Sequence, residues 1–115
     1  MITIYGIKNC NSMKKAFTLL DELGVSYQFH DYKKAAPDAV TLRTWIEQVG
    51  LDALINRKGT TWRGLSSDEQ AQAATLEGAL ELMQQKSSVI KRPVISDGQG
   101  LIICGLDEDK IRRLA

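Results

Sequence analysis

The residue with the clearest chemical signature is Cys10, one of two cysteines in this 115-residue chain. It follows a strand-like run at residues 2–5 and comes directly before a helical pattern that begins at Asn11. A thiol at a helix N-terminus faces backbone N–H groups that have no partner within the helix, and these donors favour the thiolate. Further positive charge nearby comes from three lysines, Lys8, Lys14 and Lys15. We therefore predict a reactive thiolate that needs no histidine partner.

A second candidate is the dipeptide Arg92–Pro93, which precedes a short strand-like run. Proline suits the first residue of a strand, where no N–H group is needed. The alternative is a cis peptide bond that places backbone groups beside the thiol. The planar, permanently charged guanidinium of Arg92 suits a carboxylate or an oxyanion, although a solvated arginine is the plainer interpretation.

A third candidate is the stretch from Asn56 to Gly64, which has no clean apolar period and is predicted to be a loop. Loops on a rigid scaffold often carry binding groups. This stretch could present cations and hydroxyl groups to an anionic ligand, or it could be ordinary surface, and the sequence leaves both open. Its polar candidates are Arg57, Lys58, Thr60, Thr61 and Arg63.

The remaining cysteine and the single histidine have plainer interpretations. Cys104 could be a resolving thiol, but a buried strand cysteine is favoured, because free cysteine behaves as a small apolar residue. His30 lies in a strand-like run and is interpreted as a surface or packing residue. The sequence contains no Cys-x-x-Cys or His-x-His cluster, so no metal site is predicted.

Composition limits the class of protein further. The formal net charge of +1 is too small to indicate a nucleic-acid-binding surface. No apolar run reaches the roughly 18 residues of a membrane span, and no signal-peptide pattern is present. We expect a cytoplasmic protein with reduced thiols, monomeric by default, with no membrane partner.

The apolar spacing predicts strand, helix and strand, then helices, then two strands and a helix. In the last long helix the predicted buried stripe is Leu76, Ala79, Leu80 and Met83. The two groups of strands should join into one sheet. We therefore expect a single α/β domain over residues 1–115, with a core of residues 1–36 and 87–115 and an all-helical insertion at 37–86. The predicted strands are 2–5, 26–32, 93–96 and 101–104, and the predicted helices are 11–23, 39–49 and those capped by Ser66, Thr75 and Asp107, with a short turn at 51–55.

With these elements in place, the chain resembles the ArsC/Spx superfamily, and within it the YffB-like branch. The matching stretches are residues 4–10, 56–63 and 90–93. The resemblance implies a thioredoxin/glutaredoxin-like, four-stranded mixed sheet with a helical insertion. It also implies that Pro93 is the cis-proline and that Cys10 is the catalytic cysteine.

The resemblance also assigns ligand-binding roles. Arg57 and Arg92 match two arginines that hold the oxyanion in glutathione-linked arsenate reductases. A third arginine of those enzymes falls here at Gly105, which counts against arsenate as the substrate. Spx-type regulators use a Cys-x-x-Cys switch, whereas this chain has Met13 at the second position, which weakens the switch interpretation.

The function we expect is a glutathione-dependent thiol/disulfide reductase with Cys10 as its single nucleophile. Glutathione would be a co-substrate, no cofactor would be bound, and the other substrate would be a disulfide or an oxyanion, with glutaredoxin as a further candidate partner. The alternatives are an Spx-like non-catalytic regulator that binds RNA polymerase, and an arsenate reductase. Besides Arg57, Arg92 and Pro93, the residues expected to contact glutathione or substrate are Asn9, Asn11, Thr60, Thr61 and Arg63.

Overall fold

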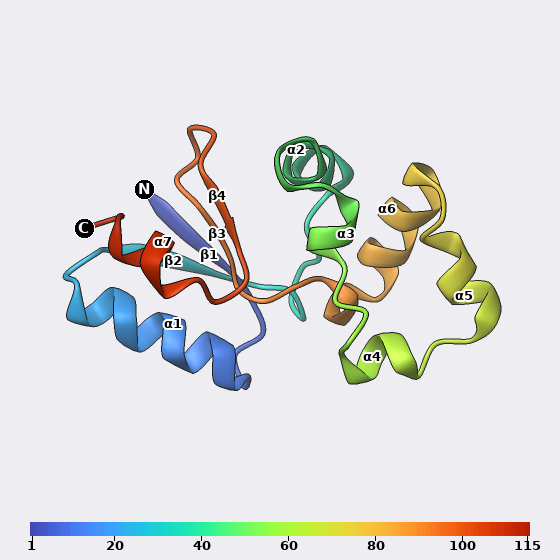
Figure 1. Cartoon of the computed structure of the whole chain (residues 1–115), viewed down its shortest axis with the longest axis horizontal. Coiled ribbons are helices and arrows are strands. Elements are labelled where there is room, and N and C mark those ends of the chain that lie inside the picture. Colours follow the sequence, from blue (N-terminus) through green and yellow to red (C-terminus); the bar gives the residue numbers. More distant parts are fainter. The chain divides into compact units, whose positions relative to one another are not determined.

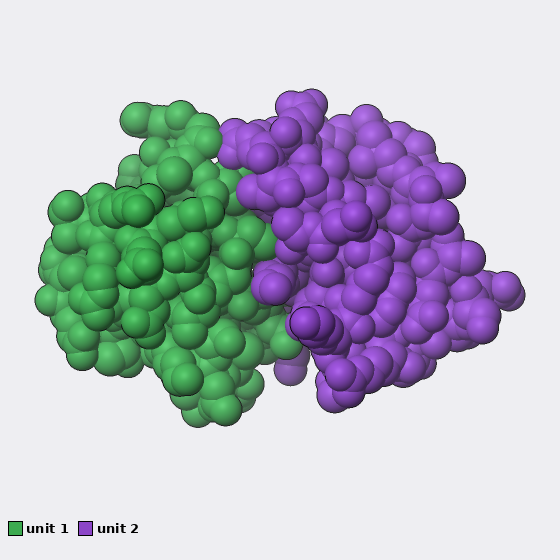
Figure 2. Space-filling model, viewed as in Figure 1, with its two compact units in different colours: residues 1–32, 92–115 green, residues 33–91 purple.

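A computed structural model describes residues 1–115, and Figure 1 labels their strands and helices. The residues group into two compact units, which Figure 2 shows in different colours. Unit 1 comprises Met1–Tyr32 and Arg92–Ala115, and unit 2 comprises Lys33–Lys91. None of the helices combines the length and the apolar composition needed to cross a membrane.

Unit 1 is built on one four-stranded sheet with the strand order β2-β1-β3-β4. Strand β1 is parallel to β2 and antiparallel to β3, which is antiparallel to β4. The predicted α/β fold with a mixed sheet is therefore confirmed, and the two groups of strands do join. The elements of unit 1 are β1 (Ile2–Gly6), α1 (Asn11–Glu22), β2 (Tyr27–Asp31), β3 (Val94–Ser96), β4 (Ile102–Cys104) and α7 (Glu108–Arg112).

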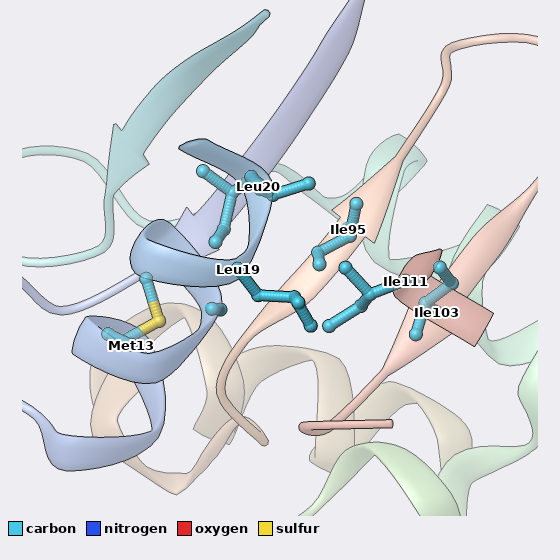
Figure 3. Close-up of a cluster of buried hydrophobic side chains, with 8 residues drawn as sticks. Met13, Leu19, Leu20, Ile95, Ile103 and Ile111 are labelled. Carbon is cyan, nitrogen blue, oxygen red and sulfur yellow. The ribbon is translucent and has the colours of Figure 1, made fainter. Parts of the chain in front are cut away.

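The core of unit 1 lies between one face of this sheet and helices α1 and α7. Ile4, Ile95 and Ile103 stand opposite one another across three neighbouring strands, and each is at most 1% exposed. Side chains of α1 and Ile111 of α7 complete the cluster (Figure 3). Burying several large aliphatic side chains, each worth about 1.5–3 kcal/mol, fixes α1 against the sheet. The position of its N-terminus is thereby fixed as well.

Unit 2 is helical, and three of its helices begin at polar residues whose side chains cap them. Asp38 accepts a hydrogen bond from the Thr41 N–H group at 2.8 Å, and Ser66 and Glu69 form the predicted capping box. An isolated bridge joins Ile55 to Ile90. The elements are α2 (Ala39–Val49), α3 (Leu51–Leu54), α4 (Thr60–Arg63), α5 (Ser67–Gln72), α6 (Leu76–Gln85) and the 3-10 helix η1 (Ser87–Val89).

Two local predictions for unit 2 are wrong. Residues 60–63 form the short helix α4 instead of continuing a loop, because a single turn is too short to display a helical period. Leu76 is 44% exposed, whereas Leu82 is buried in its place. Leu76 directly follows the Thr75 cap, so it belongs to the first turn of α6, and the buried side chains lie further along the helix.

Candidate active site

Cys10 is the N-cap residue of α1, as predicted. Its backbone is extended, with φ −138° and ψ 134°, and its carbonyl group accepts the first hydrogen bond of the helix from Lys14 at 3.0 Å. The side chain is half-buried and packs against the core cluster of unit 1. Cys10 therefore sits at an anchored helix start with part of its surface open to solvent.

The environment of Cys10 lowers the pKa of its thiol. Partial burial is the largest single influence and raises the pKa, but it is outweighed by the backbone N–H groups of Met13 and Ser12 and by the hydrogen bond and charge of Arg92. The Cys10 side chain does not form a capping hydrogen bond with the first turn of α1. Two N–H groups and a cation nevertheless act on the same sulfur atom, and all three favour the thiolate.

Arg92 lies next to Cys10, and the Arg92–Pro93 peptide bond is cis. The cis alternative for this dipeptide is confirmed, and Pro93 is buried directly before β3. The cation that favours the Cys10 thiolate is thus Arg92, from the other end of the sequence. The sequence pointed instead to Lys8, Lys14 and Lys15, and all three of these are exposed.

Met13 takes part in packing at the position where a Cys-x-x-Cys motif would place its second thiol. Its side chain is fully buried and lies against Gly6 at the end of β1. A Cβ atom added at Gly6 would overlap the Met13 sulfur. The Met13 side chain therefore fills the space beside Gly6, and it would have to shift to admit a side chain at that position.

Cys104 lies in β4 and is half-buried, so the expectation that it is a buried cysteine is wrong. Its neighbour Ile103 points into the core cluster, so Cys104 points to the opposite face of the sheet. On that side lies Tyr32, whose pKa is raised by burial and then by the charge of Cys104. Cys10 packs against the core cluster itself. Neither cysteine is in a disulfide, and this placement on opposite faces does not favour Cys104 as a resolving thiol.

In unit 2, Arg57 has two side-chain contacts. Its guanidinium donates to the Asp52 carboxylate at 3.0 Å and lies 5.3 Å from the centre of the Trp62 ring. Asn56 fixes the backbone beside Arg57, since its N–H group donates to the Val89 carbonyl at 2.8 Å. Arg57 is therefore held at a defined place while 39% of its side chain remains exposed.

The other candidates of this segment lie around α4. Thr60 and Arg63 are exposed and Thr61 is half-buried, and Thr60, Thr61 and Arg63 all belong to the helix that carries Trp62. The Trp62 carbonyl accepts a hydrogen bond from the Gln70 side chain at 3.0 Å, which ties α4 to α5. Asn9 and Asn11 flank Cys10 in unit 1 and are both exposed.

The predicted site residues thus form two groups, each within one unit. Cys10, Arg92, Pro93 and the two asparagines belong to unit 1, and Arg57 and the α4 residues belong to unit 2. Sequence reasoning did not single out Asp52 as a partner of Arg57. The five-residue separation of an acid and a base around a helix end is too common to indicate a contact. No group of three or more His, Cys, Asp or Glu side chains is placed to hold a metal ion.

Gly105, the position of the absent third arginine, follows β4 and is buried. Its φ is +89°, a conformation in which a residue with a side chain is strained. An arginine at this position would therefore be disfavoured by the backbone conformation.

Comparison with known proteins agrees with this architecture. The ArsC family matches residues 5–114 of the chain. Two solved structures are similar to it. A protein called YFFB (PA3664) is 42% identical, with a TM-score of 0.88, and the match covers 96% of this chain and 95% of that one. An arsenate reductase (ArsC) related protein from Brucella melitensis is 41% identical, with a TM-score of 0.74 and coverage of 97% and 92%.

Two further proteins are similar to this chain in sequence. An uncharacterized protein of Haemophilus influenzae is 40% identical over 104 residues, which are 89% of this chain and 90% of that protein. The global transcriptional regulator Spx of Listeria innocua is 28% identical over 115 residues, which are 98% of this chain and 86% of the regulator.

Proposed function

The chain belongs to the ArsC family, and from that premise we propose that it is a glutathione-dependent thiol/disulfide reductase whose nucleophile is the thiolate of Cys10. The observation that carries the proposal is the lowered pKa of Cys10, caused by the N–H groups of Met13 and Ser12 and by Arg92 against the opposing effect of burial. A thiolate is the attacking species in thiol–disulfide exchange.

The proposed reaction has two exchanges. In the first, the Cys10 thiolate attacks the glutathione sulfur of a mixed disulfide, so that a Cys10–glutathione disulfide forms and the substrate leaves as a thiolate. In the second, a glutathione thiolate attacks that disulfide, which regenerates Cys10 and releases oxidised glutathione. Over the two exchanges the substrate sulfur is reduced from a disulfide to a thiolate, and the sulfur of the incoming glutathione is oxidised from a thiolate to a disulfide, while the glutathione sulfur of the mixed disulfide stays in a disulfide throughout. No second protein thiol is needed, in keeping with the buried Met13 at the position of a resolving cysteine.

The anionic parts of glutathione require cations. We assign Arg92 to a carboxylate or oxyanion group next to Cys10, because its charge already acts on that sulfur. Arg57 is the second candidate, with Thr60, Thr61 and Arg63 of α4 and Asn9 and Asn11 beside Cys10 as weaker contributors. Pro93 would present its neighbouring backbone to the bound peptide. Glutathione acts here as a co-substrate, with no bound cofactor and with glutaredoxin as a possible electron donor in its place.

The test is the pH dependence of Cys10 alkylation, measured with and without glutathione, on the wild type and on Cys104→Ser. A Cys10 that alkylates below the pH range of an ordinary thiol, and that glutathione protects, supports the proposal. We expect Arg92→Ala to weaken protection by glutathione more than Arg63→Ala does. An ordinary alkylation profile that glutathione leaves unchanged would end this proposal.

A second candidate function is a regulator that binds RNA polymerase without thiol turnover. The observation that favours it is the similarity to an Spx regulator along nearly the whole chain. Against a redox-switched version stands Met13, which is buried in the core and cannot form a disulfide. Capture of polymerase by purified protein, retained in Cys10→Ser, together with an absence of turnover, would favour the regulator.

Arsenate reduction is the third possibility, suggested by the name of the Brucella melitensis protein. The strained backbone that an arginine would meet at Gly105 argues against a third anion-holding cation at that position. Purified protein supplied with glutathione and glutaredoxin should leave arsenate unreduced, and measurable arsenate consumption would reverse that assignment.

A further inference from the structure

Arg57, one of the proposed anion-binding residues, has an anion beside it, namely the carboxylate of Asp52. We infer that Asp52 sets the anion selectivity of Arg57, by occupying its guanidinium until a carboxylate or oxyanion ligand displaces it, and that Trp62 holds the guanidinium in place in both states. This inference rests on the proposed function in one respect, the assignment of Arg57 to ligand binding.

The first step is that the Asp52–Arg57 pair is weak enough to exchange. The contact is a single hydrogen bond of 3.0 Å from Nη1, and the side chains are 39% exposed for Arg57 and 93% exposed for Asp52. Ion pairs this exposed contribute little, since water and salt screen them. A ligand carboxylate or oxyanion that takes both edges of the guanidinium fork binds better than one carboxylate oxygen does.

The second step is that Trp62 does not depend on Asp52 for its position. The Trp62 carbonyl is held by the Gln70 side chain at 3.0 Å, and Gln70 belongs to α5, which the Ser66 capping box starts. The indole ring lies 5.3 Å from the guanidinium carbon of Arg57, within the range of a cation–π contact. A ring that attracts the cation through its face leaves the hydrogen-bonding edge of the guanidinium available to a ligand.

The third step is that the backbone at Arg57 is also fixed. The Asn56 side chain accepts a hydrogen bond from the Lys58 N–H group at 3.3 Å, and the Asn56 N–H group donates to Val89. Ile55, which precedes Asn56, forms an antiparallel bridge with Ile90. Because the backbone and the face of the guanidinium are both held, only the anion that binds the hydrogen-bonding edge of Arg57 can change. Asp52 thus works as an internal competitor that a weak monovalent anion does not displace.

Unit 2 offers a matched control for this idea in the Arg43–Glu77 pair. That pair has a hydrogen bond of 2.7 Å, and both of its side chains are exposed. Glu77→Gln removes the same charge from an exposed ion pair of the same unit as Asp52→Asn does. An effect of the net charge of the protein would therefore appear in both variants, whereas an effect of Asp52 on Arg57 would appear only in Asp52→Asn.

The experiment is calorimetric titration of the full chain with sodium sulfate and, separately, with glutathione, at constant ionic strength. We expect Asp52→Asn to bind both about two- to fivefold more tightly than the wild type, which corresponds to the loss of an exposed ion pair. Glu77→Gln should match the wild type. Trp62→Leu should bind about two- to fivefold more weakly, since the exposed cation–π contact is lost.

A second measurement locates the binding event. The chain has two tryptophans, Trp45 and Trp62, so Trp45→Phe leaves Trp62 as the only indole reporter. Sulfate should change its emission, and in Asp52→Asn chloride should begin to do so as well. Unchanged affinity in Asp52→Asn, an equal gain in Glu77→Gln, or no sulfate binding by any variant would each overturn the inference.

The two proposals fail separately. If sulfate binds with the expected effect of Asp52→Asn but glutathione does not bind, the role of Asp52 stands and glutathione is lost as the co-substrate. If glutathione-dependent turnover by Cys10 is normal and Asp52→Asn changes no affinity, the reductase stands and the role of Asp52 is removed.

Discussion

Cys10 and Arg57 are surrounded by different kinds of groups. Two backbone N–H groups and Arg92 lower the pKa of Cys10, and the buried hydrophobic cluster of unit 1 fixes α1, which Cys10 begins. Arg57 depends on exposed side chains, with one carboxylate at its edge and one ring at its face. Backbone N–H groups keep their positions as long as the helix is folded, whereas an exposed carboxylate can be displaced by another anion. A nucleophile that must stay in place and an anion-binding residue that must exchange its partner therefore depend on different kinds of contact.

The largest expected effect tests the nucleophile itself. Cys10→Ser should lower glutathione-dependent turnover by at least about a hundredfold, because a serine hydroxyl is not ionised near neutral pH. Steady-state rates and a thermal melt of the same sample measure activity and folding together. Cys104→Ser is the control and should retain full turnover, because Cys104 points away from the core that Cys10 contacts. Loss of turnover in a folded Cys104→Ser protein would make it a resolving thiol.

The next effect tests whether packing fixes the start of α1. Met13→Ala should lower the free energy of unfolding by about 2–5 kcal/mol, because the side chain is fully buried. Gly6→Ala should cost about 1–3 kcal/mol through overlap with the Met13 sulfur. Denaturant unfolding of both variants and of the double variant measures the coupling between them. If the cost of Gly6→Ala is the same with and without Met13, the contact does not constrain the helix.

The third prediction concerns the cation beside the thiol. Arg92→Ala should raise the pKa of Cys10 toward its ordinary value, because a hydrogen bond and a positive charge that favour the thiolate are removed. Alkylation rates of Cys10 against pH measure the shift. Lys14→Ala and Lys15→Ala are matched losses of charge on α1 and should leave the profile in place. A shift in these lysine variants, with none in Arg92→Ala, would restore the lysines suggested by the sequence.

The lowered pKa also has a consequence for stability. A thiol with a lower pKa in the folded protein stabilises the fold fully above its ordinary value of 9.0, and this contribution is lost as the pH falls through the folded-state pKa. The difference in unfolding free energy between the wild type and Cys10→Ser should therefore grow in favour of the wild type as the pH rises through that window. A difference that stays constant with pH would contradict the lowered pKa.

The smallest effect sharpens the contrast with unit 2. Asp52→Asn and Glu77→Gln should each change the free energy of unfolding by no more than about 1 kcal/mol, since both pairs are solvent-exposed. Chemical denaturation compares them directly with Met13→Ala. A loss for Asp52→Asn as large as that for Met13→Ala would mean that the Arg57 contacts support the fold rather than a ligand.

Much of the local structure could be predicted because the signals are themselves local. The start of α1 at Asn11, the Ser66 capping box and the end of α2 at Val49 each depend on a few consecutive residues. Prediction failed where an element was a single turn, as in α4, and where a helix began with an apolar residue outside its buried face, as with Leu76. In both places the segment was too short for its apolar spacing to show which residues are helical or buried.

The local sequence is enough to place Cys10 at the start of a helix, since a strand, a loop and an apolar helical period meet at that residue. It could not decide which cation the sulfur meets. Arg92 reaches Cys10 only because β3 pairs with β1, a contact between segments some ninety residues apart. The tertiary structure likewise decided that Met13 fills the core and that Asp52 and Trp62 share Arg57. Helix initiation is a property of neighbouring residues, whereas charge and packing depend on distance in space.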